Sequence, residues 1–127
     1  MTTPPTPRVF LIEENHRYDL TSLSKFGTPV FLCKERECSP FHPERTIEMI
    51  RQRLDEAEFH EEEDFICMTG QNLKIAFLLA VAANDFGVVR LLMFDAVAHA
   101  YKEGIFDLRT AEELRVAWPE KVFPHEK

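Results

Sequence analysis

The turn at residues 69–72 has the residue types and the position expected of an anion-binding loop. It consists of Thr69, Gly70, Gln71 and Asn72, and Lys74 follows within the first turn of a helix-length apolar segment. A helix N-terminus offers unpaired backbone N–H groups and a positive dipole end, which favour phosphate or carboxylate groups. The structural alternative is that Thr69 or Asn72 caps the helix and Gly70 makes the turn. A single glycine is neither a dinucleotide-binding fingerprint nor a P-loop.

Carboxylates follow two other predicted strands, Asp95 after one of them and Glu13 and Glu14, with His16, after the other. In an open parallel sheet ligands bind beyond the carboxyl ends of the strands, so these groups and the turn would share one edge. Asp95 would repel a bare anion, but it could contact a ribose hydroxyl or a cation that the ligand brings. The predicted ligand-binding residues are Thr69, Gly70, Gln71, Asn72, Lys74 and Asp95. We predict no resident metal or cofactor, because no Asp-x-Asp pair occurs near Asp95 and carboxylates at strand ends are mostly solvated.

Cys33, Cys38 and His42 form a Cys-x4-Cys-x3-His series that could begin a zinc site. Structural zinc takes four N or S ligands, and the fourth would have to come from a distant residue such as His16 or His60. We therefore favour one cysteine at a strand end and one in a loop, without zinc. The total of three cysteines is odd, which favours a reducing, cytoplasmic location.

The sequence lacks a catalytic signature. There is no Gly-x-Ser-x-Gly elbow, and the serines and the five histidines are scattered without a telling acid–base pattern. We predict no catalytic residues and favour a non-enzymatic protein.

The segments that would position the turn form one predicted β-α-β unit. Residues 65–68 are a short apolar run, residues 71–86 a helix-length apolar segment ended by Gly87, and residues 88–94 a second β-rich run. Strands that are apolar on both faces are typical of a parallel sheet covered by helices. The helix has almost no polar face, which predicts burial on all sides, either in a central position or with an outer face covered by another subunit.

Two further strands and a second helix complete the sheet and its cover. The strands are expected at 8–13 and 29–33, and the run Ser39-Pro40-Phe41-His42-Pro43 is expected to start a helix. Its apolar stripe contains Ile47, Ile50, Leu54 and Ala57. The expected fold is a single three-layer, Rossmann-like α/β domain at residues 8–118, with a short, mainly parallel sheet of about four to five strands.

The ends of the domain are less regular in pattern. Leu20–Lys25 is predicted as a short helix capped by Asp19, and residues 1–7 and 119–127 as flexible tails.

Residues 96–108 are predicted as a hairpin that turns at Lys102-Glu103-Gly104, with a short helix as the alternative. Thr110 and Glu113 fit a capping box for a final helix at 111–118.

Composition excludes two classes of partner. The formal charge is −7, so sequence-independent binding to nucleic acid, which needs a basic surface, is not expected. The longest apolar run, Ile75–Ala83, is far too short for a membrane span, and the N-terminus has no signal-peptide pattern. Residues 55–64 hold seven carboxylates without Lys or Arg, which predicts a solvated connection or, alternatively, an acidic docking surface.

Two resemblances to known proteins follow from these motifs. The segment TGQNLKIAFLLAVAA, with the strand before it, resembles the strand–Thr-Gly–helix element of CARF-type Rossmann-like domains, which bind cyclic oligonucleotides. Thr69, Gly70 and Lys74 match that element, and Gln71 stands where the family has a second glycine. Over residues 9–107 the order of elements resembles small uncharacterised α/β proteins of phage and plasmid genomes, a resemblance that implies no function.

The functional interpretation is therefore a small soluble binding or adaptor protein whose partner is another protein, reached through the acidic segment 55–64. The alternative is a Rossmann-like pocket for a nucleotide or another phosphorylated ligand at the strand carboxyl ends. Eleven phenylalanines and a helix without a polar face are more apolar surface than so small a domain can cover, which predicts a homodimer.

Overall fold

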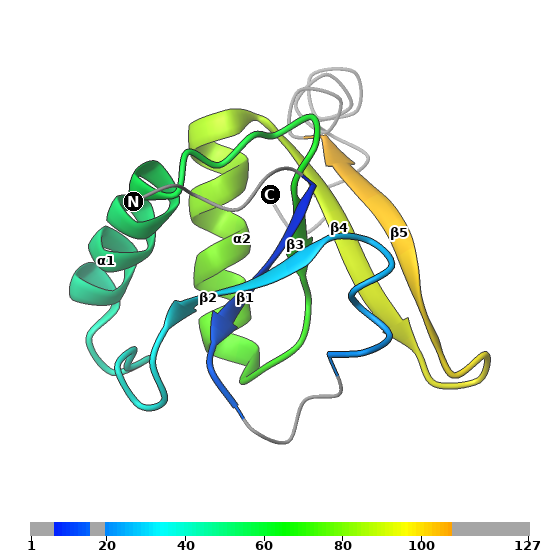
Figure 1. The fold of residues 1–127 in the computed structure, drawn as a ribbon. Coiled ribbons are helices and arrows are strands. Elements are labelled where there is room, and N and C mark those ends of the chain that lie inside the picture. Colours follow the sequence, from blue (N-terminus) through cyan, green and yellow to red (C-terminus); the bar gives the residue numbers. More distant parts are fainter. Residues whose placement is uncertain (1–6, 16–19, 108–127) are drawn as a thin grey trace, which may run out of the picture.

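The computed structural model describes residues 7–15 and 20–107 (Figure 1). It contains a five-stranded sheet and two helices. The strands are β1 (Arg8–Glu13), β2 (Thr28–Cys33), β3 (Phe65–Cys67), β4 (Val88–Asp95) and β5 (Ala100–Asp107). The helices are α1 (Pro43–Glu56) and α2 (Asn72–Phe86). The predicted final helix at 111–118 and both predicted tails, apart from Pro7, lie outside the described residues.

The strand order is β2-β1-β3-β4-β5, with the first four strands parallel and β5 antiparallel to β4. The prediction of a mainly parallel α/β domain with a C-terminal hairpin is confirmed. The chain moves outward from β1 to β2, then crosses back over β1 to β3 and continues to β4. Right-handed crossovers in opposite directions lie on opposite faces of the sheet. The connections through α1 and α2 therefore share one face, and the β1–β2 connection covers the other.

The burial pattern of β1 shows that both faces are covered. Phe10 and Ile12 pack into the core cluster that also holds buried residues of α1 and α2, and Figure 1 shows both helices on one side of the sheet. Val9 and Leu11 pack on the opposite face with Leu23. In the described part of the chain, the layer that covers this opposite face is a turn segment at residues 21–26.

The predicted helix at Leu20–Lys25 is wrong, because residues 21–26 form consecutive turns. Leu20 O accepts hydrogen bonds from Leu23 N and Ser24 N, and Leu23 O accepts one from Phe26 N. Gly27 then passes so close to Pro7 that an added Cβ would lie 2.5 Å from Pro7 O. This contact leaves room for glycine alone at the end of the segment, and the proposed cap, Asp19, lies outside the described residues.

Helix α2 is less buried than its composition predicted. Its inner side is fully packed, but Leu73, Ala76 and Ala80 are exposed along one stripe. Within the single chain this stripe of the helix is not covered, and cover by another subunit stays a prediction. Gly87, in the left-handed conformation with φ 83°, ends the helix by donating its N–H to Ala83 O.

The hairpin turn lies at residues 96–99 and not at Lys102-Glu103-Gly104, which are inside β5. Asp95 Oδ1 accepts hydrogen bonds from Val97 N (2.9 Å) and Ala98 N (3.1 Å), which fixes the turn immediately after β4. A Cβ at Gly104 would lie 2.7 Å from Met93 Cε, the end of a flexible and partly exposed side chain that can move aside.

The acidic segment 55–64 contains one fully buried carboxylate, Asp64. Its oxygens accept hydrogen bonds from Arg8 N, Arg8 Nε, Arg8 Nη2 and His60 N at 2.7–3.2 Å. The Arg8 guanidinium also donates to Ala57 O and Glu58 O, so it ties the end of α1 to the start of β1. The segment is therefore only partly a solvated connection.

Candidate functional site

The carboxyl ends of β1 and β3 are neighbours at the point where the winding of the sheet reverses. Open α/β sheets bind ligands at such a reversal, because the connections on either side diverge to opposite faces. The structure brings three predicted groups to this edge: Glu13 at the end of β1, the turn 69–72 after β3, and Lys74 in α2.

Gln71 is the N-cap of α2, in place of the predicted Thr69 or Asn72. Its backbone is extended (φ −69°, ψ 131°), and its Oε1 accepts a hydrogen bond from Lys74 N at 3.0 Å. One of the free N–H groups of the helix is thus already satisfied by the protein. Gly70 has φ 140°, a backbone conformation that side chains rarely allow, so its role in the turn is confirmed.

The side chain of Thr69 contacts Tyr101 of the β4–β5 hairpin and Cys67, on the face of the sheet opposite the helices. Its Oγ1 lies 3.3 Å from Tyr101 Oη and accepts a hydrogen bond from Cys67 Sγ at 3.4 Å. Burial raises the pKa of the Cys67 thiol, which therefore stays protonated and serves as a donor. Thr69 has a structural partner and does not contribute to the same cluster as Lys74.

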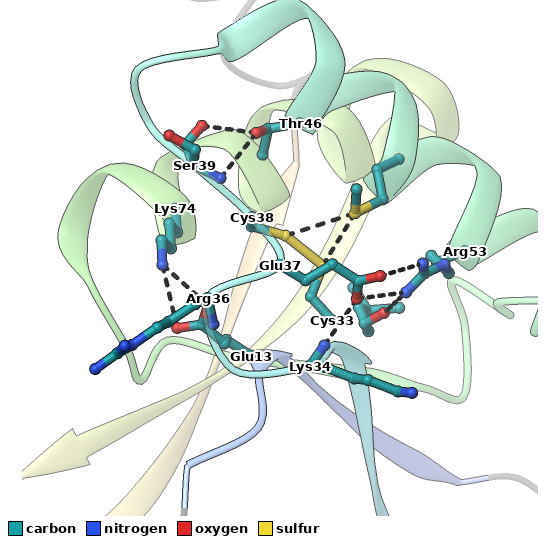
Figure 2. Close-up of a disulfide and its surroundings, with 12 residues drawn as sticks. Glu13, Cys33, Lys34, Arg36, Glu37, Cys38, Ser39, Thr46, Arg53 and Lys74 are labelled. Atoms are coloured by element: carbon teal, nitrogen blue, oxygen red, sulfur yellow. Dashed lines mark hydrogen bonds and ion pairs between the residues drawn. A yellow bond between two sulfur atoms is a disulfide. The ribbon is translucent and has the colours of Figure 1, made fainter.

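Lys74 forms an ion pair with Glu13 across the reversal point (Figure 2). Its Nζ lies 3.0 and 3.2 Å from the two carboxylate oxygens, and the side chains of Lys74 and Glu13 are 12% and 17% exposed. Glu13 Oε2 also accepts a hydrogen bond from Arg36 N at 2.8 Å. An anionic ligand at α2 would have to compete with Glu13 for Lys74.

Asp95 lies away from this edge. In the parallel register Cys67 is opposite Leu92, so Asp95 is three residues further along β4, a distance of about 10 Å. Its Oδ2 pairs with Lys102 Nζ at 2.8 Å. The Lys102 ammonium, with the N–H groups of Ala98 and Val97, holds the pKa of Asp95 below its usual value. The contacts of Asp95 serve the hairpin, and a ligand-binding role for it stays a prediction.

Cys33 and Cys38 form a disulfide, a pairing that the sequence interpretation missed (Figure 2). Both residues are buried, and Met49 Sδ lies 3.7 and 3.9 Å from their sulfur atoms. The pairing leaves neither sulfur free as a zinc ligand, so the zinc alternative is not supported. Within residues 7–15 and 20–107, no three His, Cys, Asp or Glu side chains are grouped so as to hold a metal ion. His16 lies outside these ranges.

A groove of about 570 Å³ between α1 and α2 was not anticipated from the sequence. An ion pair lies along it, with Arg51 Nε 2.7 Å from Asp85 Oδ2. Arg51 lowers the pKa of Asp85. These two charges satisfy each other, so the groove offers no free charged group from this pair.

Comparison with protein-family models gives one decisive match. The model described as phage Pam3 gp32-like protein matches residues 7–108, which is most of the chain. The chain belongs to this family. The membership supports the resemblance to small phage proteins. Comparisons with curated proteins and with solved structures found no match.

Neither helix of the described part of this phage-type protein is both long and apolar enough to cross a membrane.

Proposed function

We propose that this member of the phage Pam3 gp32-like family is a non-enzymatic binding protein that contacts another protein through the β4–β5 hairpin, in the cytoplasm of the infected cell. The observation that carries the proposal is the distribution of exposed apolar side chains. Of the six large hydrophobic residues that are exposed in the described part of the chain, four lie on this hairpin. They are Met93, Phe94, Val97 and Ile105.

The exposure of these residues is unusual for a chain that stays alone in water. Val97 is 99% exposed and Ile105 is 73% exposed. Single exposed hydrophobic residues are common, but a concentration of them on one element is typical of a protein-binding surface. Charged pairs lie beside them, Asp95–Lys102 and Arg90–Glu103, as in the polar rim of an interface.

The position of β5 adds a second mode of contact. β5 is the outermost strand of the sheet and is eight residues long. The outer side of an edge strand carries backbone N–H and C=O groups that can pair with a strand of a partner. A second copy of the chain is the first partner to test, in agreement with the surplus of apolar surface.

The nucleotide-pocket alternative receives less support from the contacts at the predicted ligand site. Lys74 is paired with Glu13, Gln71 caps α2, and Thr69 contacts Tyr101. A ligand would have to replace interactions that already satisfy these groups, at a cost in free energy. The acidic segment 55–64 stays a secondary docking surface in the proposal, without Asp64, whose carboxylate is buried.

The test is sedimentation velocity of the full chain and of a Val97→Asp/Ile105→Asp variant over a wide range of concentration. We expect the wild type to self-associate and the variant to do so at least about tenfold more weakly, because charges replace buried apolar area. Leu73→Asp, on the exposed stripe of α2, is the matched control and should leave association unchanged. The proposal is contradicted if the hairpin variant alters neither self-association nor binding to co-expressed proteins of the phage.

A thermal-shift screen against nucleotides and cyclic oligonucleotides distinguishes the alternative. A ligand that binds the native state raises its apparent stability. A rise that is lost in Lys74→Met would favour the nucleotide pocket over protein binding.

A further inference from the structure

We propose that Cys33 and Cys38 are a reversible redox site, whose oxidation state decides whether the turn Lys34–Glu37 is held against Glu13 at the carboxyl end of β1. The co-reactant is a small dithiol, or two monothiols, on the reducing side and a disulfide compound on the oxidising side. The proposal does not depend on the protein-binding function.

The pair lies where it can be opened without disrupting the sheet. Cys33 is the last residue of β2, which is an outer strand, and Cys38 follows a turn whose four residues are all exposed. The sulfur atoms are buried, with both residues 2% exposed, so attack by a thiol requires movement of the turn. Local opening of an exposed turn at a sheet edge takes much less free energy than global unfolding.

The side chain of Met49 can contact the two cysteine sulfur atoms in both the disulfide and the dithiol. Met49 Sδ is 3.7 Å from Cys33 Sγ and 3.9 Å from Cys38 Sγ. In the disulfide these are packing contacts of a polarisable thioether. In the dithiol, the same sulfur can accept an S–H hydrogen bond from either cysteine, so reduction does not leave a buried donor without an acceptor nearby.

The turn between the cysteines is held in a conformation that it would not adopt alone. Arg36 has φ 65°, in the left-handed region that is unfavourable for a residue with a side chain. Three contacts and the disulfide maintain it (Figure 2). Arg36 N donates to Glu13, Glu37 pairs with Arg53 at 2.9 Å, and Lys34 N donates to Glu37 at 2.9 Å. Loss of the covalent tether lets Arg36 relax and releases its N–H from Glu13.

The short loop favours reversibility. The cysteines are five positions apart, and the stabilisation that a disulfide gives by closing a loop increases with the length of that loop. A disulfide that closes so few residues adds less stability than one that joins distant segments. In a reducing cytoplasm the dithiol would therefore form, and the disulfide would return in oxidising surroundings.

The reaction balances in two steps. A thiolate of the dithiol attacks one cysteine sulfur, the S–S bond breaks, and a mixed disulfide forms while the other cysteine leaves as a thiolate and takes a proton. The second thiolate of the reagent then attacks the mixed disulfide. Two electrons and two protons reach Cys33 and Cys38, and the reagent leaves as a cyclic disulfide.

The test compares the folded full-length chain after equilibration with oxidised glutathione and with dithiothreitol. Thiol counting should give one free thiol, Cys67, in the first state and three in the second, with the circular dichroism spectrum unchanged. Limited trypsin digestion should cleave after Lys34 or Arg36 about tenfold faster, or more, in the reduced protein, because the turn has lost its tether.

Two variants act as matched controls. Cys33→Ser/Cys38→Ser should be cleaved at the fast rate under both conditions, and Cys67→Ala should keep the wild-type response. Three outcomes with the wild type alone would overturn the proposal: three thiols after oxidation, a disulfide that dithiothreitol reduces only in the unfolded chain, or equal cleavage rates in the two states.

Discussion

The two ends of β1 each carry an ion pair, and the two pairs differ in almost every physical respect. At the start of the strand, Arg8 and Asp64 are 3% and 0% exposed in their side chains. At the end, Glu13 and Lys74 are 17% and 12% exposed. The side chains of the first pair form four further hydrogen bonds with backbone groups, whereas those of the second have the single contact of Glu13 with Arg36 N.

The comparison distinguishes an ion pair that stabilises the fold from an ion pair whose contacts can change. Charges removed from water are tolerated only if every donor and acceptor has a partner, and Arg8 and Asp64 meet that condition. Such a pair cannot be rearranged without large loss of stability. Lys74 and Glu13 remain in contact with water and border the turn that the disulfide closes, so their contacts can change at low cost. We therefore expect that contacts at the second end of β1, and not at the first, change when Cys33 and Cys38 are oxidised or reduced.

The largest effect should come from breaking the buried pair. Asp64→Ala leaves the Arg8 guanidinium without its counter-charge in the interior, and we expect a loss of about 3–5 kcal/mol in the free energy of unfolding. Urea denaturation of the variant and the wild type measures it. Glu103→Ala is the control, because it removes an exposed carboxylate that lies 3.5 Å from the partly exposed Arg90, and it should cost less than about 1 kcal/mol.

An apolar double replacement sharpens this prediction. Arg8→Met/Asp64→Leu should recover part of the lost stability, since no charge is then left unpaired. Recovery should be incomplete because Ala57 O and Glu58 O lose their donor. If Asp64→Ala and Glu103→Ala were equally stable, the Arg8–Asp64 pair at the start of β1 would not be the pair that stabilises the fold.

A smaller effect is expected at the other end. A double-mutant cycle with Glu13→Gln and Lys74→Met should give a coupling energy of about 1 kcal/mol at low ionic strength. Because both side chains still contact water, salt should reduce this coupling. The same cycle at Arg8 and Asp64 should change little with salt. A Glu13–Lys74 coupling that resists high salt would contradict the distinction between the two ends.

The pattern of residues was sufficient to predict the sheet, but not its turns. The run Val9–Ile12 is buried on both faces, as its unbroken apolar character indicated. The sequence predicts Gly104 as a turn residue, because glycine usually marks turns. Gly104 instead lies inside β5 opposite Leu91, a position that depends on the neighbouring strand and leaves no local signal.

The sequence was sufficient to predict site residues only where they lie close together along the chain. Lys74 and the turn after β3 could be placed at the sheet edge from their order in the chain. The partner of Lys74, Glu13, lies 61 positions away, and Asp64 lies 56 positions from Arg8, so neither pair is visible in a sequence window. The spacing of Cys33 and Cys38 was visible, but their pairing depends on where β2 ends.

The smallest effect concerns Glu37, which links the disulfide-closed turn to α1. A hydrogen bond from Arg53 and one from the backbone N–H of Lys34 lower the pKa of Glu37 from 4.5 to about 2. Because the folded-state pKa lies below the unfolded one, the stability that Glu37 contributes is fully present above pH 4.5 and is lost as the pH falls through about 2. The side chains are about one third exposed, so we expect less than about 1 kcal/mol.

The measurement is the difference in unfolding free energy between the wild type and Glu37→Gln as a function of pH. The difference should be constant from neutral pH down to about 5 and then shrink toward zero near pH 2. Glu35→Gln, which removes a negative charge from the same turn, is the matched control for the change in net charge. A Glu37→Gln difference that stays constant across the acid range would show that the contacts with Arg53 and Lys34 do not hold the turn. The adjustable end of β1 would then depend on the disulfide and on the Glu13 contact with Arg36 alone.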